Sequence, residues 1–178
     1  MRSVTIARNY AEALVALADK GPGSDEDWGT LIDATSAAMM APAVEAALMS
    51  PRVPRDRKVA IVSAAHASAP RPYVLFLAAV IRRGRQMLLP QIADEYRALV
   101  DIKLNRVRAS VVMARDVDAL TRSVLVDQLA RAIGKSIIAG FSTDPALLGG
   151  VVVRIGDRVY DGSARKRLAV LRQRLLAG

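Results

Sequence analysis

The 178-residue sequence contains no cysteine and a single histidine. The lack of cysteine excludes a disulfide framework, a thiolate metal site and a cysteine nucleophile. One histidine excludes a metal site built from several imidazoles. Aromatic residues make up only 4% of the chain. None of them is interleaved with the basic clusters, which disfavours the base-stacking surfaces of RNA-binding modules.

Long hydrophobic runs are absent as well. The longest extends from Val74 to Ile81, far short of the roughly 20 apolar residues of a membrane-spanning helix. We therefore expect no direct insertion into a membrane. Arg8, Asn9 and Glu12 interrupt the N-terminal stretch, which makes it too polar for the core of a secretory signal. It is amphipathic like a mitochondrial presequence but lacks a serine-rich leader, and we interpret it as the first structural helix.

Basic residues are abundant: 26 Lys and Arg stand against 17 Asp and Glu, a net charge of +9. Such a balance fits a nucleic acid, a membrane surface or an acidic protein as partner. Three interpretations of the basic clusters stay open: a solvated face, a contact with an acidic or helical protein, and nucleic-acid binding. The clusters comprise Arg52, Arg55, Arg57, Lys58, Arg82, Arg83, Arg85, Arg165, Lys166, Arg167, Arg172 and Arg174.

The first part of the chain has apolar residues at helical spacing, interrupted at short intervals by proline or glycine. Ser24 and Asp27 have the spacing of a helix N-cap pair, and Gly84 fits a helix end. The pattern predicts helices over about 4–19, 24–39, 42–49, 54–66, 73–83 and 90–105.

After Arg106 apolar and polar residues alternate, which is strand spacing. Gly156-Asp157 fits a two-residue hairpin turn. We expect strands over 107–113, 136–143, 150–155 and 158–160, a helix that Asp116 or Asp118 caps and that reaches Ile133, and a final helix after Ser163. The predicted fold class is α+β: an N-terminal six-helix bundle in residues 1–105, then a small C-terminal β-α-β-β-α domain in residues 106–178.

No arrangement of polar residues predicts an active site. His66 lies among alanines near a helix end, and the glutamates are scattered without metal-ligand spacing. The aspartates between residues 144 and 161 each fit a turn or a cap. Gly149-Gly150 leads into a β-branched strand, whereas a phosphate-binding loop leads into a helix, so close backbone packing explains the pair better. We expect no catalytic residue, cofactor or metal.

The first and fifth predicted helices carry more apolar surface than a bundle core requires. Two explanations remain open. Either both helices are central in the bundle, or they form the walls of a groove that binds a partner helix.

Three stretches resemble one family. They are ARNYAEALVALA at 7–18, RRGRQMLLPQIADEY at 82–96 and DPALLGGVVVRIGDRVYDGSARKRLAVLRQRL at 144–175. The third combines an acidic residue, a glycine pair, a β-branched strand, a Gly-Asp turn, Asp-Gly-Ser and a basic helix. In this order and spacing they resemble the delta subunit of bacterial F-type ATP synthase, called the oligomycin-sensitivity-conferring protein in mitochondria. The resemblance covers the whole chain.

The resemblance implies a non-catalytic stator subunit that joins the catalytic head to the peripheral stalk. In that position it resists rotary torque and keeps proton flow coupled to ATP synthesis. It also implies one copy in each complex, peripheral to the membrane on its cytoplasmic face. The absence of a presequence favours a bacterial protein over an organellar one.

The resemblance also implies two partner-binding sites. In the family the bundle binds the N-terminal helix of an alpha subunit between the first and fifth helices, and the C-terminal domain contacts the ends of the b subunits. For the alpha-subunit groove we expect Ala7, Tyr10, Ala11, Leu14, Phe76, Ala79 and Val80. For the stalk contact we expect Gly149, Gly150, Val152, Arg154, Arg165 and Leu168.

The charge of +9 is high for this family. It predicts a stalk contact with a strong electrostatic part, which salt would weaken. The alternative function is a basic α+β protein that binds RNA or the ribosome, with a steep dependence of affinity on salt.

Overall fold

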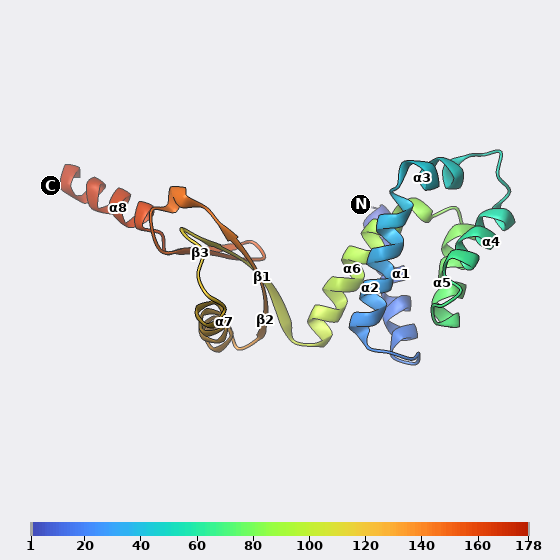
Figure 1. Cartoon of the computed structure of the whole chain (residues 1–178), viewed down its shortest axis with the longest axis horizontal. Coiled ribbons are helices and arrows are strands. Elements are labelled where there is room, and N and C mark those ends of the chain that lie inside the picture. The colour runs from blue at the N-terminus through green and yellow to red at the C-terminus, as the bar shows by residue number, and fades with distance from the viewer. Residues whose placement is uncertain (1, 178) are drawn as a thin grey trace. The chain divides into compact units, whose positions relative to one another are not determined.

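The computed structural model describes residues 2–177 (Figure 1). The chain divides into two compact units, residues 1–100 and residues 101–178. The change from helical to strand spacing in the sequence predicts a division a few residues later, at 105/106. The helix α6, Leu89–Lys103, is continuous across the division, so its periodicity gives no signal there.

The described part of the first unit is helical. Proline and glycine delimit most of its helices, because proline starts a helix well and glycine ends one well. Five helices precede α6: α1 Arg2–Ala18, α2 Asp25–Met39, α3 Pro42–Met49, α4 Arg55–Ala65 and α5 Arg71–Arg82. A short 3-10 turn, η1 Gln86–Leu88, leads into α6.

The start of α2 illustrates how local sequence places these helices. The Ser24 hydroxyl accepts a hydrogen bond from the Asp27 backbone N–H at 3.2 Å, and the Asp27 carboxylate accepts one from the Ser24 backbone N–H at 2.8 Å. This capping box confirms the predicted N-cap pair. The backbone N–H and the hydroxyl of Ser24 both donate to the Asp27 carboxylate, and these two hydrogen bonds hold the pKa of Asp27 below its ordinary value.

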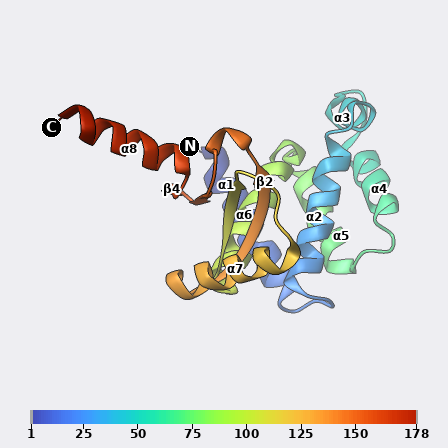
Figure 2. The same cartoon turned by 60° about the vertical axis from the view of Figure 1, so that its left-hand side comes forward.

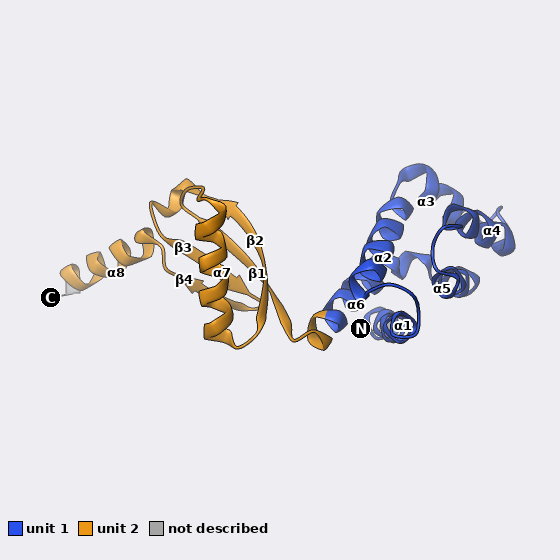
Figure 3. Cartoon of the chain, turned by 60° about the horizontal axis from the view of Figure 1, so that its bottom comes forward, with its two compact units in different colours: residues 1–100 blue, residues 101–178 orange. Residues whose placement is uncertain are grey.

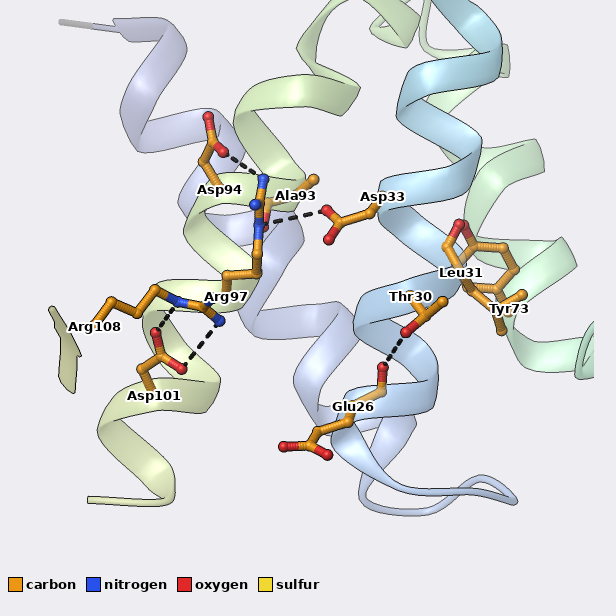
Figure 4. A network of polar contacts seen from close by, with 10 residues as sticks. All are labelled: Glu26, Thr30, Leu31, Asp33, Tyr73, Ala93, Asp94, Arg97, Asp101 and Arg108. Atoms are coloured by element: carbon orange, nitrogen blue, oxygen red, sulfur yellow. Dashed lines mark hydrogen bonds and ion pairs between the residues drawn. The ribbon is translucent and has the colours of Figure 1, made fainter. Parts of the chain in front are cut away.

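Aromatic side chains form the centre of the first unit's core. Trp28, Tyr73 and Tyr96 are fully buried, and the rings of Trp28 and Tyr73 meet edge to face at 5.9 Å between centroids. Their polar atoms are paired: the indole N–H donates to the Pro22 carbonyl at 2.9 Å and the Tyr96 hydroxyl to the Asp25 carbonyl at 3.0 Å. At the surface, Arg97 of α6 reaches Asp33 of α2 at 3.4 Å (Figure 4).

The second unit contains a four-stranded sheet in the order β2-β1-β3-β4. Its strands are β1 Arg106–Met113, β2 Ser136–Thr143, β3 Val151–Ile155 and β4 Arg158–Asp161. β1 and β2 are parallel and joined by α7, Ala119–Ile133, whereas β3 lies antiparallel to β1 and β4 antiparallel to β3. A short turn, η2 Pro145–Leu147, precedes β3, and α8, Ala164–Ala177, ends the chain.

The α+β class is confirmed, but the predicted order of the C-terminal domain is wrong. The described residues of the second unit run β-α-β-β-β-α rather than β-α-β-β-α. The predicted strand 158–160 is present as β4, paired with β3 through the tight Gly156-Asp157 turn, and the predicted order β-α-β-β-α does not count it.

One face of the sheet forms the second unit's core. Ala109, Val111 and Met113 of β1 and Val153 of β3 are buried, and Leu125 and Leu129 of α7 pack against them. Figure 2 shows α7 crossing the sheet and α8 extending away from it, and Figure 3 colours the two units separately. The opposite face of the sheet, which includes Val152 and Arg154, is only partly covered.

Candidate partner-binding surfaces

The residues predicted for the alpha-subunit groove lie together, but most of them face inward. Tyr10 is only 8% exposed, and its ring meets that of Phe76 at 6.2 Å between centroids. Of the predicted residues only Ala79 is exposed. The buried ones hold α1 against α5 in the unit's own core: Ala7, Tyr10, Ala11, Leu14, Phe76 and Val80. Their contact with a partner stays a prediction; the structure places them in the core, and apolar periodicity alone does not distinguish a core face from a groove.

Basic side chains at the end of α5 attach that end to α1. Arg83 donates a hydrogen bond to the Tyr10 hydroxyl at 3.2 Å, and the guanidinium of Arg85 lies 5.6 Å from the centre of the Tyr10 ring. Arg55 of α4 donates to the carbonyl of Arg82 at 3.3 Å. Part of this basic cluster therefore has intramolecular partners, which favours a structural role for it.

The outward side of α5 presents an apolar surface. Leu75 is 61% exposed, and Ala79 follows one turn later. A hollow of about 360 Å³ lies along them, bordered on the other side by Val59 and Ser63 of α4. Arg82 and Arg83 close the end of the hollow. We call Leu75, Ala79, Arg82 and Arg83 the α5 strip.

The glycine pair at the start of β3 has a structural explanation. Gly150 has φ +78°, and a Cβ there would lie 2.4 Å from the carbonyl oxygen of Gly162. The carbonyl of Gly149 accepts a hydrogen bond from the backbone N–H of Ala164 at 2.9 Å. The pair brings the start of β3 against the start of α8, which confirms the expected close backbone packing. Gly149 is half-buried and Gly150 exposed.

The same loop borders a hollow in the second unit that the sequence did not predict. Its volume is about 600 Å³, and its walls are α7, the end of β1 and the residues around Gly149. Leu148 lies at its edge, 70% exposed and with φ +63°, an unusual backbone conformation for leucine. The sequence signal for this hollow is weak and consists of two leucines, Leu147 and Leu148, before the glycine pair.

Hydrogen bonds hold the start of α8 in place, whereas the rest of the helix, residues 165–176, is exposed. Ser163 is fully buried, and its hydroxyl accepts a hydrogen bond from the backbone N–H of Lys166 at 3.2 Å. The Asp161 carboxylate accepts one from the backbone N–H of Ser163 at 2.9 Å, which lowers the pKa of Asp161. Arg165 and Leu168 are both exposed, so these two predicted stalk residues are available to a partner.

The histidine lies in a structural network. His66 ends α4; its Nε2 lies 2.8 Å from the Thr35 hydroxyl, and its Nδ1 lies 2.9 Å from the Val62 carbonyl. The Tyr73 hydroxyl lies 2.6 Å from the same Thr35 oxygen, and burial raises the pKa of Tyr73 to about 12. The network joins α2, α4 and α5.

Within residues 2–177 no group of three or more His, Cys, Asp or Glu side chains could hold a metal ion. No single helix in that range is long and apolar enough to cross a membrane, and only α2 and α3, bent by 83°, meet the length and composition when taken together.

Comparisons with known proteins agree on one family. The family model for the ATP synthase delta (OSCP) subunit matches residues 6–175. The chain is 39% identical to the ATP synthase subunit delta of Gemmatimonas aurantiaca, over 96% of this chain and 93% of that one. It is 36% identical to that of Anaeromyxobacter dehalogenans, over 96% and 97%. A chain in a Toxoplasma gondii mitochondrial ATP synthase hexamer shares the fold, with a TM-score of 0.63, 18% identity and coverage of 97% and 98%.

These matches span nearly the whole chain. They favour the ATP synthase family over the alternative interpretation as an RNA-binding protein. The family is a structural part of ATP synthase and not a catalytic subunit. The chain belongs to the ATP synthase delta (OSCP) subunit family.

Proposed function

We propose that this subunit is the stator connector of ATP synthase, with one copy in each complex on the cytoplasmic face of a bacterial membrane. Its N-terminal unit binds the catalytic head and its C-terminal unit binds the peripheral stalk, so that the head does not turn with the rotor. The observation that carries the proposal is the pair of exposed apolar surfaces, one on each compact unit: the α5 strip and the body of α8.

The head contact is the N-terminal helix of an alpha subunit on the α5 strip. Leu75 supplies an exposed apolar anchor, and the small side chain of Ala79 allows close approach of a helix. The buried contact between Tyr10 and Phe76 gives the strip a rigid support. A single helix docked in this way covers on the order of 800 Å² on each side, enough for nanomolar binding.

The stalk contact involves the b subunits, the open sheet face and α8. Val152 and Arg154 lie on the face opposite α7, and Arg165 and Leu168 lie on the exposed body of α8. Gly149 and Gly150 support this region by packing the sheet against the start of α8. The role is mechanical, since a stator needs stiff attachment at both ends.

Calorimetric titration with a peptide of the host alpha-subunit N-terminus tests the head contact. We expect one-to-one, sub-micromolar binding, weakened at least about tenfold by Leu75→Asp, because a charge would replace a buried leucine. Ile61→Asp is the matched control: Ile61 is also exposed, but it does not border the hollow beside the α5 strip. Equal weakening by both variants, or none by Leu75→Asp, would contradict this assignment.

A further inference from the structure

The described body of α8 exposes its apolar residues. Between residues 165 and 176 no side chain is buried, although Leu168, Leu171 and Leu175 are 56%, 54% and 75% exposed. Only the first turn is attached to the unit, through the hydrogen bond from Ala164 to Gly149. Leucines at spacings of 3 and 4 form one narrow stripe on a helix. An exposed apolar stripe of this kind indicates a surface that binds a partner.

The stripe follows a heptad pattern. Leu168 and Leu175 occupy a positions, and Ala164 and Leu171 occupy d positions. The flanking e and g positions are all arginine: Arg165, Arg167, Arg172 and Arg174. We call these eight residues the α8 seam. The f positions, on the far side of the helix, hold Lys166 and Gln173.

In coiled coils the e and g residues choose the partner, because they face the e and g residues of the opposite helix. Arginine at every one of these positions places like charges opposite each other in a pair of α8 helices, whether the two run parallel or antiparallel. The seam therefore opposes pairing with a second copy of the chain. It is complementary to a helix whose e and g residues are Glu or Asp.

We propose that the α8 seam docks one acidic heptad helix, with Leu or Ile at its a and d positions and carboxylates at e and g. The inference rests on the proposed stalk contact, for which it names the partner's chemistry. Residues 164–178 contain five basic residues and no acidic one, so the attraction is unopposed within the helix. The partner's carboxylates pair with the arginines on both sides of the leucines.

An anionic membrane is the other surface that binds basic amphipathic helices. Val170 and Leu176 are also exposed, but they lie at c and b positions outside the stripe. The apolar residues therefore do not form the one broad face, often with Trp or Phe, of an interfacial helix, and α8 contains no aromatic residue. The regular placement of arginine on both edges also suits a helix of defined width better than a lipid surface.

The test uses the full chain and fluorescence anisotropy with three labelled synthetic peptides of about four heptads. All three carry Leu and Ile at a and d; e and g are Glu in the first, Gln in the second and Lys in the third. We expect the Glu peptide to bind about tenfold or more tighter than the Gln peptide, and the Lys peptide not to bind. The preference should shrink between about 0.1 M and about 1 M salt, where the Debye length falls from about 10 to about 3 Å.

Substitutions in α8 test whether the α8 seam is the surface that binds the peptide. Arg167→Glu with Arg174→Glu should remove the preference for the Glu peptide, whereas Lys166→Glu with Gln173→Glu, on the far side, should keep it. Leu171→Asp should abolish binding while circular dichroism shows α8 and the rest of the chain folded. Equal binding of the three peptides, no binding of any, or tighter binding to vesicles of anionic lipid than to the Glu peptide would overturn the proposal.

The cytoplasmic part of the host b subunits serves as a further probe. It distinguishes failure of the α8 seam from failure of the proposed stalk contact. Binding of b subunits that Leu171→Asp leaves unchanged would overturn the seam and leave the stator function standing. Binding of the Glu peptide without binding of b subunits would support the seam and contradict the stalk contact.

Discussion

The close approach of Gly150 to Gly162 predicts a large and local loss of stability on substitution. In Gly150→Ala the new Cβ would lie 2.4 Å from the Gly162 carbonyl oxygen, and the backbone would keep φ +78°. The positive φ alone costs about 1–2 kcal/mol for alanine, and moving the two segments apart adds about 1–3 kcal/mol. We therefore expect the free energy of unfolding of the second unit to fall by about 2–5 kcal/mol.

Gly134→Ala is the matched control. Gly134 has φ +73° at the end of α7, and nothing lies within 4 Å of its added Cβ. It should lose only the conformational part, about 1–2 kcal/mol. The difference between the two variants isolates the close packing of β3 against the start of α8.

Urea unfolding followed by two probes measures the effect. Trp28 is the single tryptophan and lies in the first unit, so its fluorescence reports that unit, while far-ultraviolet circular dichroism reports both. Gly150→Ala should shift the dichroism transition and leave the fluorescence midpoint unchanged. Equal losses in Gly150→Ala and Gly134→Ala would refute the packing argument.

Two further predictions concern the first unit. Thr35→Val should cost about 2–3 kcal/mol of unfolding free energy, because a buried hydroxyl with three partners is lost; Thr30→Val, at an exposed position of the same helix, should change it by less than about 0.5 kcal/mol in the same urea titration. The lowered pKa of Asp27 means that its stabilisation is present above the ordinary pKa of 3.8 and is lost as pH falls through the lower folded value. In Ser24→Ala the free energy of unfolding should therefore depend less steeply on pH below about 3.8. An Asp27 pKa near 3.8 in the native protein, measured by NMR titration, would contradict this prediction.

The helices of the first unit were largely predictable, because local chemistry decides where they begin and end. Ser24 and Asp27 form the expected cap, and Arg8, Asn9 and Glu12 of α1 are exposed, in keeping with the amphipathic pattern of that stretch. The sequence did not show whether the surplus apolar surface of α1 and α5 belongs to the core or to a partner-binding groove. Tyr10 and Phe76 meet each other in the core, and only contacts distant in sequence decide that.

The second unit shows the same limit. The Gly149-Gly150 pair indicated close packing, and the structure identifies Gly162 as the segment that it approaches. The leucine spacing of α8 was visible in the sequence, but periodicity predicts which side of a helix is apolar and not whether anything covers it. The exposed Leu148 depends on a positive φ that no local pattern requires.

Simultaneous binding of the two partners tests the central claim most directly. Analytical ultracentrifugation of the full chain with the alpha-subunit peptide and the cytoplasmic part of the b subunits should show one complex that contains all three. Leu75→Asp should remove only the peptide, and Leu171→Asp should remove only the b subunits. Displacement of one partner by the other, or loss of both from a single variant, would contradict a connector with two separate surfaces.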